Sequence, residues 1–256
     1  MELKENERID DLEFKGYKII QNTDGFCFGI DSILLSDFAK NIRNNSNVMD
    51  LGTGTGILCI LLSGKTQLNN IVGVEVQEEV ANMAKRSVEL NHLENKITIL
   101  NDNILNLEDK FDKSSFDAIV TNPPYKKMDT GITNDNNKKL ISRHEVTANL
   151  EDFIKVSKNL LKDKGEFYMV HRPERLVDIL YLMRKYKIEP KQIRFIAPKI
   201  GKKPNLVLIK GVKNAKEFLK FDKILYVYNE DGSYTDEILK IYGKTVKWNP
   251  EPIDHK

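Results

Sequence analysis

The stretch NVMDLGTGTG, residues 47–56, decides the fold class of this chain. Its first half is a short apolar run that contains Asp50, and its second half places glycines at positions 52, 54 and 56. A leucine-rich segment follows at once, so the stretch predicts a buried strand, a glycine-rich turn and a helix ending near residue 62. Such a turn brings backbone N–H groups close to a ligand, which makes it a candidate binding loop.

The same alternation continues along the rest of the chain. We expect further strands at residues 71–76, 97–100, 116–121, 166–170, 193–197 and 206–211, and further helices at 77–91, at 150–161 with Gly165 as its stop, and from Pro173 onward. Strands that alternate with helices predict an α/β fold, with a doubly wound, mostly parallel, seven-stranded sheet and helices on both faces. The ligand of such a sheet lies beyond the carboxyl ends of its strands, near the switch in strand order.

The composition indicates one domain. Its 256 residues are 40% hydrophobic and 30% charged, which suffices for one large core. The first residues are acidic and polar, and no run approaches the roughly 18 apolar residues of a membrane span. Cys27 and Cys59 stand in apolar stretches without a CxxC partner, so we expect core thiols rather than a disulfide framework or a structural zinc site. We therefore expect a cytoplasmic protein without membrane contact.

The net charge of +2 conceals an uneven distribution along the sequence. Residues 121–210 carry 20 basic and 10 acidic side chains, whereas residues 1–120 carry 12 basic and 20 acidic ones. Lysines on helix surfaces often serve only solubility. Their concentration in one part of the chain favours a polyanion such as nucleic acid as partner.

The glycine turn fits neither common nucleotide-binding motif. The dinucleotide pattern GxGxxG does not match, and the P-loop pattern before Gly64, Lys65 and Thr66 would need a glycine where the chain has Cys59. What remains is Asp50 with its glycine turn, followed by Glu75 at the end of the next strand. A carboxylate at that place can accept hydrogen bonds from two ribose hydroxyls, and no phosphate is needed for this arrangement.

A second motif, NPPY at residues 122–125, ends the strand at 116–121. Together with DLGTGTG it resembles the class I, Rossmann-like methyltransferases that use S-adenosylmethionine to methylate exocyclic amines. The resemblance covers most of the chain: FCFGIDSILLSDFA, SRHEVTANLEDF, HRPERLVDILYLMRKYKIEP and PKIGKKPNLVLIKG are similar to the bacterial tRNA adenine-N6 methyltransferases that modify the anticodon loop of valine tRNA. It implies S-adenosylmethionine as cofactor, and a monomer or homodimer that holds the tRNA anticodon stem-loop through the basic residues 126–203.

This resemblance divides the single domain into three parts. Residues 1–46 form a segment that covers the cofactor, residues 47–213 form the methyltransferase core, and residues 214–256 form a C-terminal extension. The extension contains apolar residues 224–228 and a helix near 235–242, and it either packs back on the sheet or mediates an oligomer.

The resemblance also assigns cofactor-binding residues. They are Phe28, Asp31, Asp50, Gly52, Gly54, Gly56, Glu75, Asp102 and Asn122. Asp50 and the turn hold the methionine portion, Glu75 holds the ribose, and Asp102 accepts from the adenine amine. Phe28, Asp31 and Ser32 cover the methionine end. Two alternatives stay open: Asp31 caps a helix, and Asp102 is a solvated turn residue.

The NPPY corner has the chemistry that amine methylation needs. An aromatic amine is a poor nucleophile because its lone pair is delocalised into the ring. The amide oxygen of Asn122 and the carbonyl of Pro123 can accept its two N–H groups, and neither Pro123 nor Pro124 has an N–H to compete. The prolines also fix both acceptors in advance. Tyr125 would stack on the flipped base.

Segments near the corner complete the expected site. Residues 126–139 are polar and flanked by lysine pairs, which suits a loop that grips the substrate. His171 and Arg172 follow a predicted strand and would line the rim of the pocket, with neither acting in catalysis.

Other functions remain open from the sequence. The corner also fits adenine methylation in DNA or rRNA, or methylation of protein glutamine. Only about 46 residues precede the first strand and about 45 follow the last, which leaves little room for a separate recognition domain. A splayed RNA loop base needs less protein, so tRNA adenine is preferred. The non-enzymatic alternative is an RNA-binding protein with a vestigial cofactor pocket.

Overall fold

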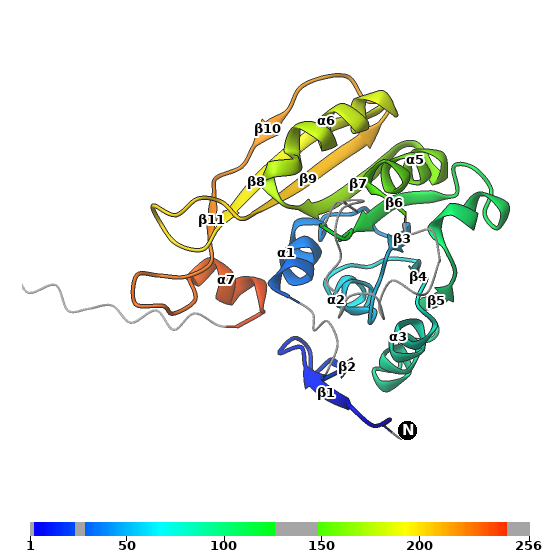
Figure 1. Cartoon of the computed structure of the whole chain (residues 1–256), viewed down its shortest axis with the longest axis vertical. Coiled ribbons are helices and arrows are strands. Elements are labelled where there is room, and N and C mark those ends of the chain that lie inside the picture. The colour runs from blue at the N-terminus through cyan, green and yellow to red at the C-terminus, as the bar shows by residue number, and fades with distance from the viewer. Residues whose placement is uncertain (1–2, 24–28, 126–147, 245–256) are drawn as a thin grey trace, which may run out of the picture.

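One central sheet organises the chain (Figure 1). The computed structural model describes residues 3–23, 29–125 and 148–244. The long strands are β3 (Asn47–Leu51), β4 (Asn70–Glu75), β5 (Ile97–Asn101), β6 (Phe116–Thr121), β7 (Leu161–His171), β8 (Ile188–Ala197) and β9 (Leu206–Lys213), and they run in the order β8-β9-β7-β6-β3-β4-β5. Only β9 is antiparallel to its neighbours, so the predicted mostly parallel sheet is confirmed.

Two short strands enlarge the predicted seven-stranded sheet to nine strands in the described part of the chain. Strands β10 (Lys220–Phe221) and β11 (Leu225–Tyr226) pair in parallel with β8, at the edge of the sheet. The C-terminal extension therefore packs back on the sheet, which is one of the two alternatives that the sequence left open. Its backbone covers part of an edge that would otherwise expose unpaired N–H and C=O groups.

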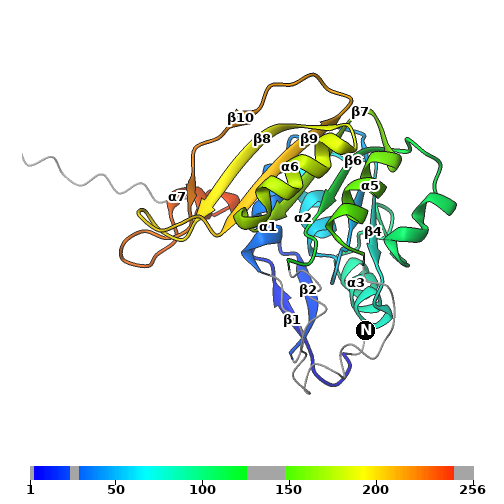
Figure 2. The same cartoon turned by 45° about the horizontal axis from the view of Figure 1, so that its top comes forward.

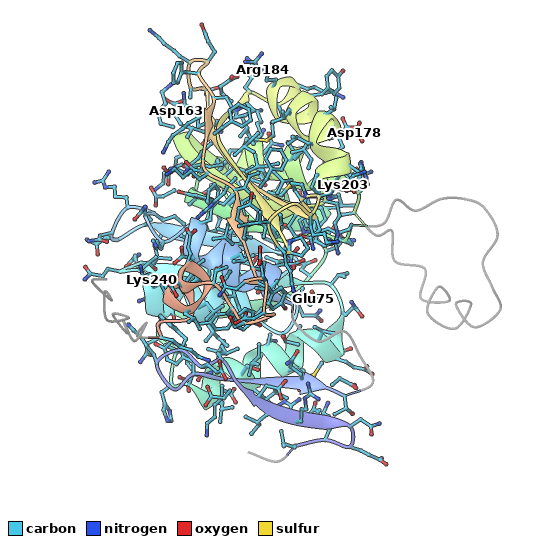
Figure 3. All side chains as sticks on the ribbon, turned by 90° about the vertical axis from the view of Figure 1, so that its left-hand side faces the viewer. Glu75, Asp163, Asp178, Arg184, Lys203 and Lys240 are labelled. Atoms are coloured by element: carbon cyan, nitrogen blue, oxygen red, sulfur yellow. The ribbon has the colours of Figure 1, made fainter. Side chains whose placement is uncertain are left out.

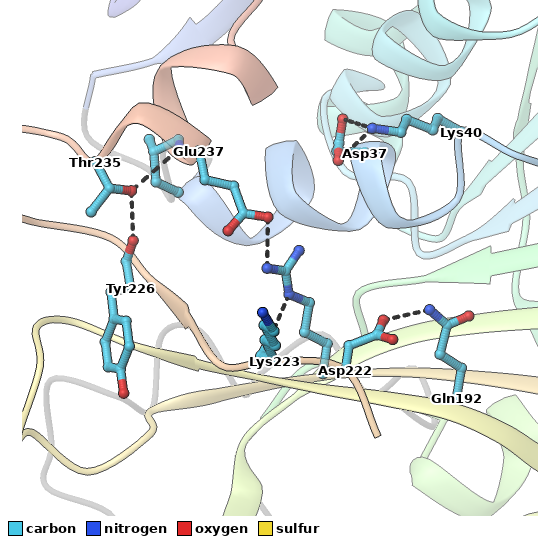
Figure 4. Close-up of polar contacts among 10 residues, drawn as sticks. Asp37, Lys40, Gln192, Asp222, Lys223, Tyr226, Thr235 and Glu237 are labelled. Atoms are coloured by element: carbon cyan, nitrogen blue, oxygen red, sulfur yellow. Dashed lines mark hydrogen bonds and ion pairs between the residues drawn. The ribbon is translucent and has the colours of Figure 1, made fainter. Parts of the chain in front are cut away.

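Side-chain bonds fasten this extension to β8 and to itself. The amide of Gln192 donates to Asp222, and the hydroxyl of Thr235 donates to the carbonyl of Tyr226 (Figure 4). Thr235 also caps helix α7 (Asp236–Ile241), close to where the sequence predicts a helix. Lys65 then donates to the carbonyl of Ile241 at 3.0 Å, which ties α7 to the core.

Helices cover both faces of the sheet. One face carries α1 (Ile30–Phe38), α2 (Ile57–Lys65), α3 (Glu78–Leu90) and α7, and the other carries the 3-10 helix η1 (Ile104–Asp109), α5 (Leu150–Leu160) and α6 (Leu176–Lys185), of which α5 and α6 lie in front in Figure 2. Successive residues of β3 enter different cores: Val48 packs with the first group of helices and Met49 with the second. Burial on both faces explains why these strands are continuously apolar.

Two local features differ from expectation. Gly165 does not follow a helix: α5 ends at Leu160, β7 begins at the next residue, and Gly165 lies within it. The pairing of β6 with β7 is irregular here, and a Cβ on Gly165 would lie 2.9 Å from the carbonyl of Lys162. The helix expected from Pro173 begins as a 3-10 turn, η3 (Pro173–Arg175), that leads into α6.

An N-terminal hairpin was not predicted. Strands β1 (Glu7–Asp11) and β2 (Lys18–Asn22) form a separate two-stranded sheet against α3. Ile20 donates its N–H to the hydroxyl of Ser87 at 3.0 Å, and Arg86 forms an ion pair with Glu7. In the described residues, no helix has the length and apolar character that crossing a membrane requires.

The carboxyl ends of the parallel strands form one edge of the molecule. In Figure 3, Lys203 and Asp178, which follow β8 and β7, lie on the side opposite to Asp163, near the start of β7. The strand order switches between β3 and β6, which both pair in parallel within the sheet. Ligands bind at such switch points in open α/β sheets.

Candidate active site

The glycine turn after β3 is held by its own backbone and by the next strand. The N–H groups of Gly52 and Thr53 both donate to the carbonyl of Val74 at 2.9 Å. Gly54 has φ +58°, and its N–H donates to Oε2 of Glu75 at 3.0 Å. A Cβ on Gly54 would meet nothing within 4 Å, so open space lies beside this residue.

Glu75 ends β4 with a carboxylate that is fixed in direction. It is 7% exposed, and its Oε1 accepts the N–H of Gln77 at 2.9 Å while Oε2 accepts that of Gly54. Burial raises the pKa of this carboxyl, although the backbone hydrogen bonds oppose the shift. Each carboxylate oxygen keeps lone-pair capacity for a further donor such as a hydroxyl.

Asp50 is a buried carboxylate with one oxygen that has no partner among the described residues. It is 1% exposed, and among the described residues its Oδ1 has no hydrogen-bond donor. Its Oδ2 accepts a weak hydrogen bond from the thiol of Cys59, at 3.6 Å, and Thr53 also lies within reach of this carboxylate. Burial raises the pKa of Asp50 to about 7, and the charge of Glu75 adds to the shift. Cys59 itself is fully buried, as predicted for a core thiol.

Asp102 lies beside Glu75 but is already engaged. Its Oδ1 accepts the N–H of Asn103 at 2.7 Å and the amide of Asn106 at 3.0 Å, and Lys110 forms an ion pair with Oδ2. Lys110 holds the pKa of this carboxyl below its usual range, with smaller contributions from the two hydrogen bonds. Asp102 is therefore ordered by local partners rather than solvated.

The NPPY corner meets α1 through Tyr125. The phenol oxygen lies 2.5 Å from Oδ2 of Asp31 and 2.8 Å from the side-chain oxygen position of Asn122. A phenol has one proton, and Asp31 can only accept it. The NH₂ of Asn122 can donate to the hydroxyl of Ser32, 3.5 Å away, and the oxygen of Asn122 faces Tyr125. Burial, and then the charge of Asp31, raises the pKa of Tyr125.

Helix α1 does begin at this segment, but Asp31 does not cap it. The N-cap residue is Gly29, no side chain makes a cap hydrogen bond, and Asp31 stands in the first turn. Its carboxylate is therefore free to bind Tyr125. Phe28, Cys27 and the loop 126–139 lie outside the described residues.

The structure thus places the predicted site residues in two groups. Asp50, Gly54 and Glu75 surround the glycine turn, and Asp31, Asn122 and Tyr125 are joined by direct contacts. The contacts that the sequence did not predict join Tyr125 to two consecutive residues at the end of β7. The ring centre of His171, the buried last residue of the strand, lies 5.1 Å from that of Tyr125, and the guanidinium of Arg172, the next residue, lies 4.8 Å from it. The sequence placed both only at the rim.

More than half of the chain matches a known protein family. The family model described as "Methyltransferase small domain" matches residues 29–185. The chain belongs to this family. Its members transfer methyl groups, so the expected enzyme class is confirmed.

Curated relatives match almost the whole chain. A protein of Porphyromonas gingivalis is 25% identical, over 91% of this chain and 93% of its own, and one of Haemophilus influenzae is 28% identical, over 89% and 94%. Both are named tRNA1(Val) (adenine(37)-N6)-methyltransferase.

Solved structures share the fold. A predicted O-methyltransferase of Agrobacterium tumefaciens is 19% identical with a TM-score of 0.67, covering 83% of this chain and 95% of that one. The 16S rRNA N2 G1207 methyltransferase of T. thermophilus, solved with AdoMet and guanosine, is 20% identical with a TM-score of 0.57, covering 83% and 52%. At these identities the similarity shows the fold, which is the predicted class I methyltransferase fold. Together with the family it implies S-adenosylmethionine as cofactor.

Proposed function

We propose that this methyltransferase transfers the methyl group of S-adenosylmethionine to the N6 amine of adenine 37, in the anticodon loop of valine tRNA. The observation that carries the proposal is the NPPY corner at the end of β6, next to β3 and its glycine turn at the switch point of the sheet. The names of the full-length relatives favour tRNA over DNA, rRNA or protein glutamine. Action on tRNA makes the cytoplasm the proposed compartment.

The residues around the glycine turn fit the cofactor. The unpartnered Oδ1 of Asp50 can accept from the α-ammonium of the methionine portion, which would supply the missing donor. Glu75 can accept from the ribose hydroxyls, and the space beside Gly54 leaves room for close approach. When bound, the cofactor supplies an electrophilic methyl group on a positively charged sulfur.

The corner prepares the amine. Asn122 and the carbonyl of Pro123 accept the two N–H groups of the adenine amine, which directs the nitrogen lone pair at the methyl group. The bound cofactor would supply the methyl group to this nitrogen and leave as the neutral thioether, and the methylated amine would release one proton to water. Asp31 holds the Tyr125 ring by its hydroxyl, so α1 positions the stacking residue. This supports a covering role for the second half of segment 1–46, whereas the β1–β2 hairpin lies against α3.

Replacing Gly54 with alanine should lower the affinity for the cofactor strongly and lower the stability of the fold only slightly. The positive φ costs alanine about 1 kcal/mol of stability. The added methyl group would enter the open space that we assign to the cofactor, so we expect its dissociation constant to rise more than about tenfold. Calorimetry with S-adenosylmethionine measures this.

Gly232→Ala is the matched control. Gly232 also has positive φ, +90°, with nothing within 4 Å of its Cβ position, but it lies in the turn before α7. It should lose similar stability and keep full cofactor affinity. Equal affinity losses in both variants would show that the Gly54 effect is a general consequence of backbone strain.

The tip of the hairpin between β8 and β9 is the proposed RNA contact among the described basic residues. Lys202 and Lys203 are exposed, and within the described residues neither forms an ion pair. They follow β8, whose carboxyl end lies at the same sheet edge as the corner. By contrast, Arg184 and Arg194 are paired with Glu189 and Glu237.

Charge reversal of Lys202 and Lys203 to glutamate should weaken tRNA binding and reduce the slope of log K against log salt by about 1 to 2. Filter binding across a salt series measures both. Lys113→Glu with Lys216→Glu makes the same change at exposed positions of the opposite edge, before β6 and after β9. Equal slopes for the two double variants would place the RNA elsewhere.

The target position can be tested with transcripts of valine tRNA. We expect N6-methyladenosine in the unmodified transcript and none in a transcript that carries guanine at position 37. Methylation of both would reject adenine 37 as the site, and methylation of neither would reject the substrate.

A further inference from the structure

Arg172 lies between the NPPY corner and the β8–β9 hairpin, at the carboxyl end of the sheet. It directly follows β7, and its guanidinium carbon lies 4.8 Å from the centre of the Tyr125 ring. Its Nη1 donates to the carbonyl of Asn205 at 2.9 Å, at the base of the β8–β9 hairpin. Arg172 therefore connects the corner to the hairpin that carries Lys202 and Lys203.

These contacts fix the direction of the guanidinium. Tyr125 is itself held, with its hydroxyl at Asp31 and its ring against His171. A guanidinium that lies over a ring held in this way, and that is bonded to a backbone carbonyl, loses little freedom when it binds a further group.

The charge at this position belongs to Arg172. His171 is 1% exposed and its Nδ1 accepts the N–H of Arg172 at 2.7 Å. Burial lowers the pKa of His171 to about 4, so the imidazole is neutral near pH 7. The positive charge beside the ring is therefore that of the guanidinium.

Arg172 also has unused donors. Its guanidinium has five N–H groups, and Nη1 serves the carbonyl of Asn205. Arg172 is exposed, and in residues 3–23, 29–125 and 148–244 no carboxylate forms an ion pair with it, whereas the nearby Arg175 is paired with Asp178 at 2.8 Å. An exposed guanidinium with free N–H groups in one plane is suited to bidentate binding of phosphate.

We propose that Arg172 binds the backbone phosphate beside the target adenine. One nucleotide would then be held at both ends, its base by Tyr125 and its phosphate by Arg172, which stabilises the base outside its stack. The inference rests on the proposed function, because it takes RNA as substrate and Tyr125 as the stacking residue.

The test uses anticodon stem-loops of valine tRNA in which one phosphate next to adenine 37 is replaced by an uncharged methylphosphonate. Wild-type protein should bind one of these about tenfold more weakly than the unmodified stem-loop. Arg172→Ala should bind the unmodified stem-loop about tenfold more weakly, lose nothing further at that phosphate, and show a salt slope smaller by about 1. An equal methylphosphonate penalty in both proteins overturns the contact.

Control variants separate the contact from a loss of structure. Arg184→Ala removes a guanidinium from α6 that is paired with Glu189, and its affinities should equal those of the wild type. Arg172→Lys keeps the charge without the planar donors, so it should retain the salt slope and recover only part of the affinity. Recovery of full affinity with lysine would reject a bidentate contact.

Binding is measured without turnover, so the two proposals can fail separately. A stem-loop that binds with the expected pattern and receives no methyl group overturns the proposed function and supports the Arg172 contact. A stem-loop that is methylated, with equal penalties in wild type and Arg172→Ala, overturns the contact alone. Failure of the wild type to bind the stem-loop overturns both.

Discussion

Asn122→Ala should lower kcat by about 10²–10³, the cost of losing one preorganised polar group that stabilises a transition state. The dissociation constant of S-adenosylmethionine should stay nearly unchanged, because the amide contacts Ser32 and Tyr125 rather than the residues of the glycine turn. Single-turnover methyl transfer and calorimetry give the two quantities separately.

Asn229→Ala serves as control for the loss of an asparagine. Among the described residues, its amide bonds only within the turn before α7, to Ser233 and Tyr234. We expect wild-type turnover from this variant. If Asn122→Ala also keeps wild-type turnover, the amide does not activate the amine, and the chemical interpretation of the corner is wrong.

Asp50→Asn should weaken cofactor binding and at the same time increase the stability of the cofactor-free protein. Removing the buried carboxylate leaves the ammonium group of the cofactor without its partner, so we expect the dissociation constant to rise by about 10²–10³. Without cofactor the variant should be more stable than the wild type near pH 8, because a buried charged carboxylate with one unpartnered oxygen opposes folding.

The pH dependence follows from the sign of the pKa shift. The pKa of Asp50 is raised in the folded protein from 3.8 to about 7, so between these values the folded state keeps a proton that the unfolded state has lost. Stability contributed by this group is full below pH 3.8 and is lost as the pH rises to about 7, by about 4 kcal/mol at most. Urea unfolding at several pH values measures it. The advantage of Asp50→Asn should grow from pH 4 to pH 8, and an advantage that does not change with pH would contradict the assignment.

The sequence best predicted those site residues that lie at the carboxyl ends of strands. Residues 47–56 predicted a strand, turn and helix that the structure confirms as β3, the glycine turn and α2. The alternation of strands and helices placed Glu75 and Asn122 at one edge, since parallel strands must align their carboxyl ends. These predictions succeeded because each depends on residues close together in the chain.

Tertiary contacts explain what the sequence did not predict. The β1–β2 hairpin is held by α3, and the two-residue strands β10 and β11 exist only through pairing with β8. Likewise the contact of Arg172 with Tyr125 and with the carbonyl of Asn205 joins three distant segments. No local pattern carries such information, so His171 and Arg172 could be placed at the rim but not given a partner.

The most direct test of the central claim is methyl transfer from labelled S-adenosylmethionine to bulk tRNA from a strain that lacks this gene, with duplex DNA in parallel. Nucleoside digestion and mass spectrometry identify the product. We expect N6-methyladenosine from the tRNA and no label in the DNA. Label in DNA or in protein, or no label in any substrate despite cofactor binding, would contradict it.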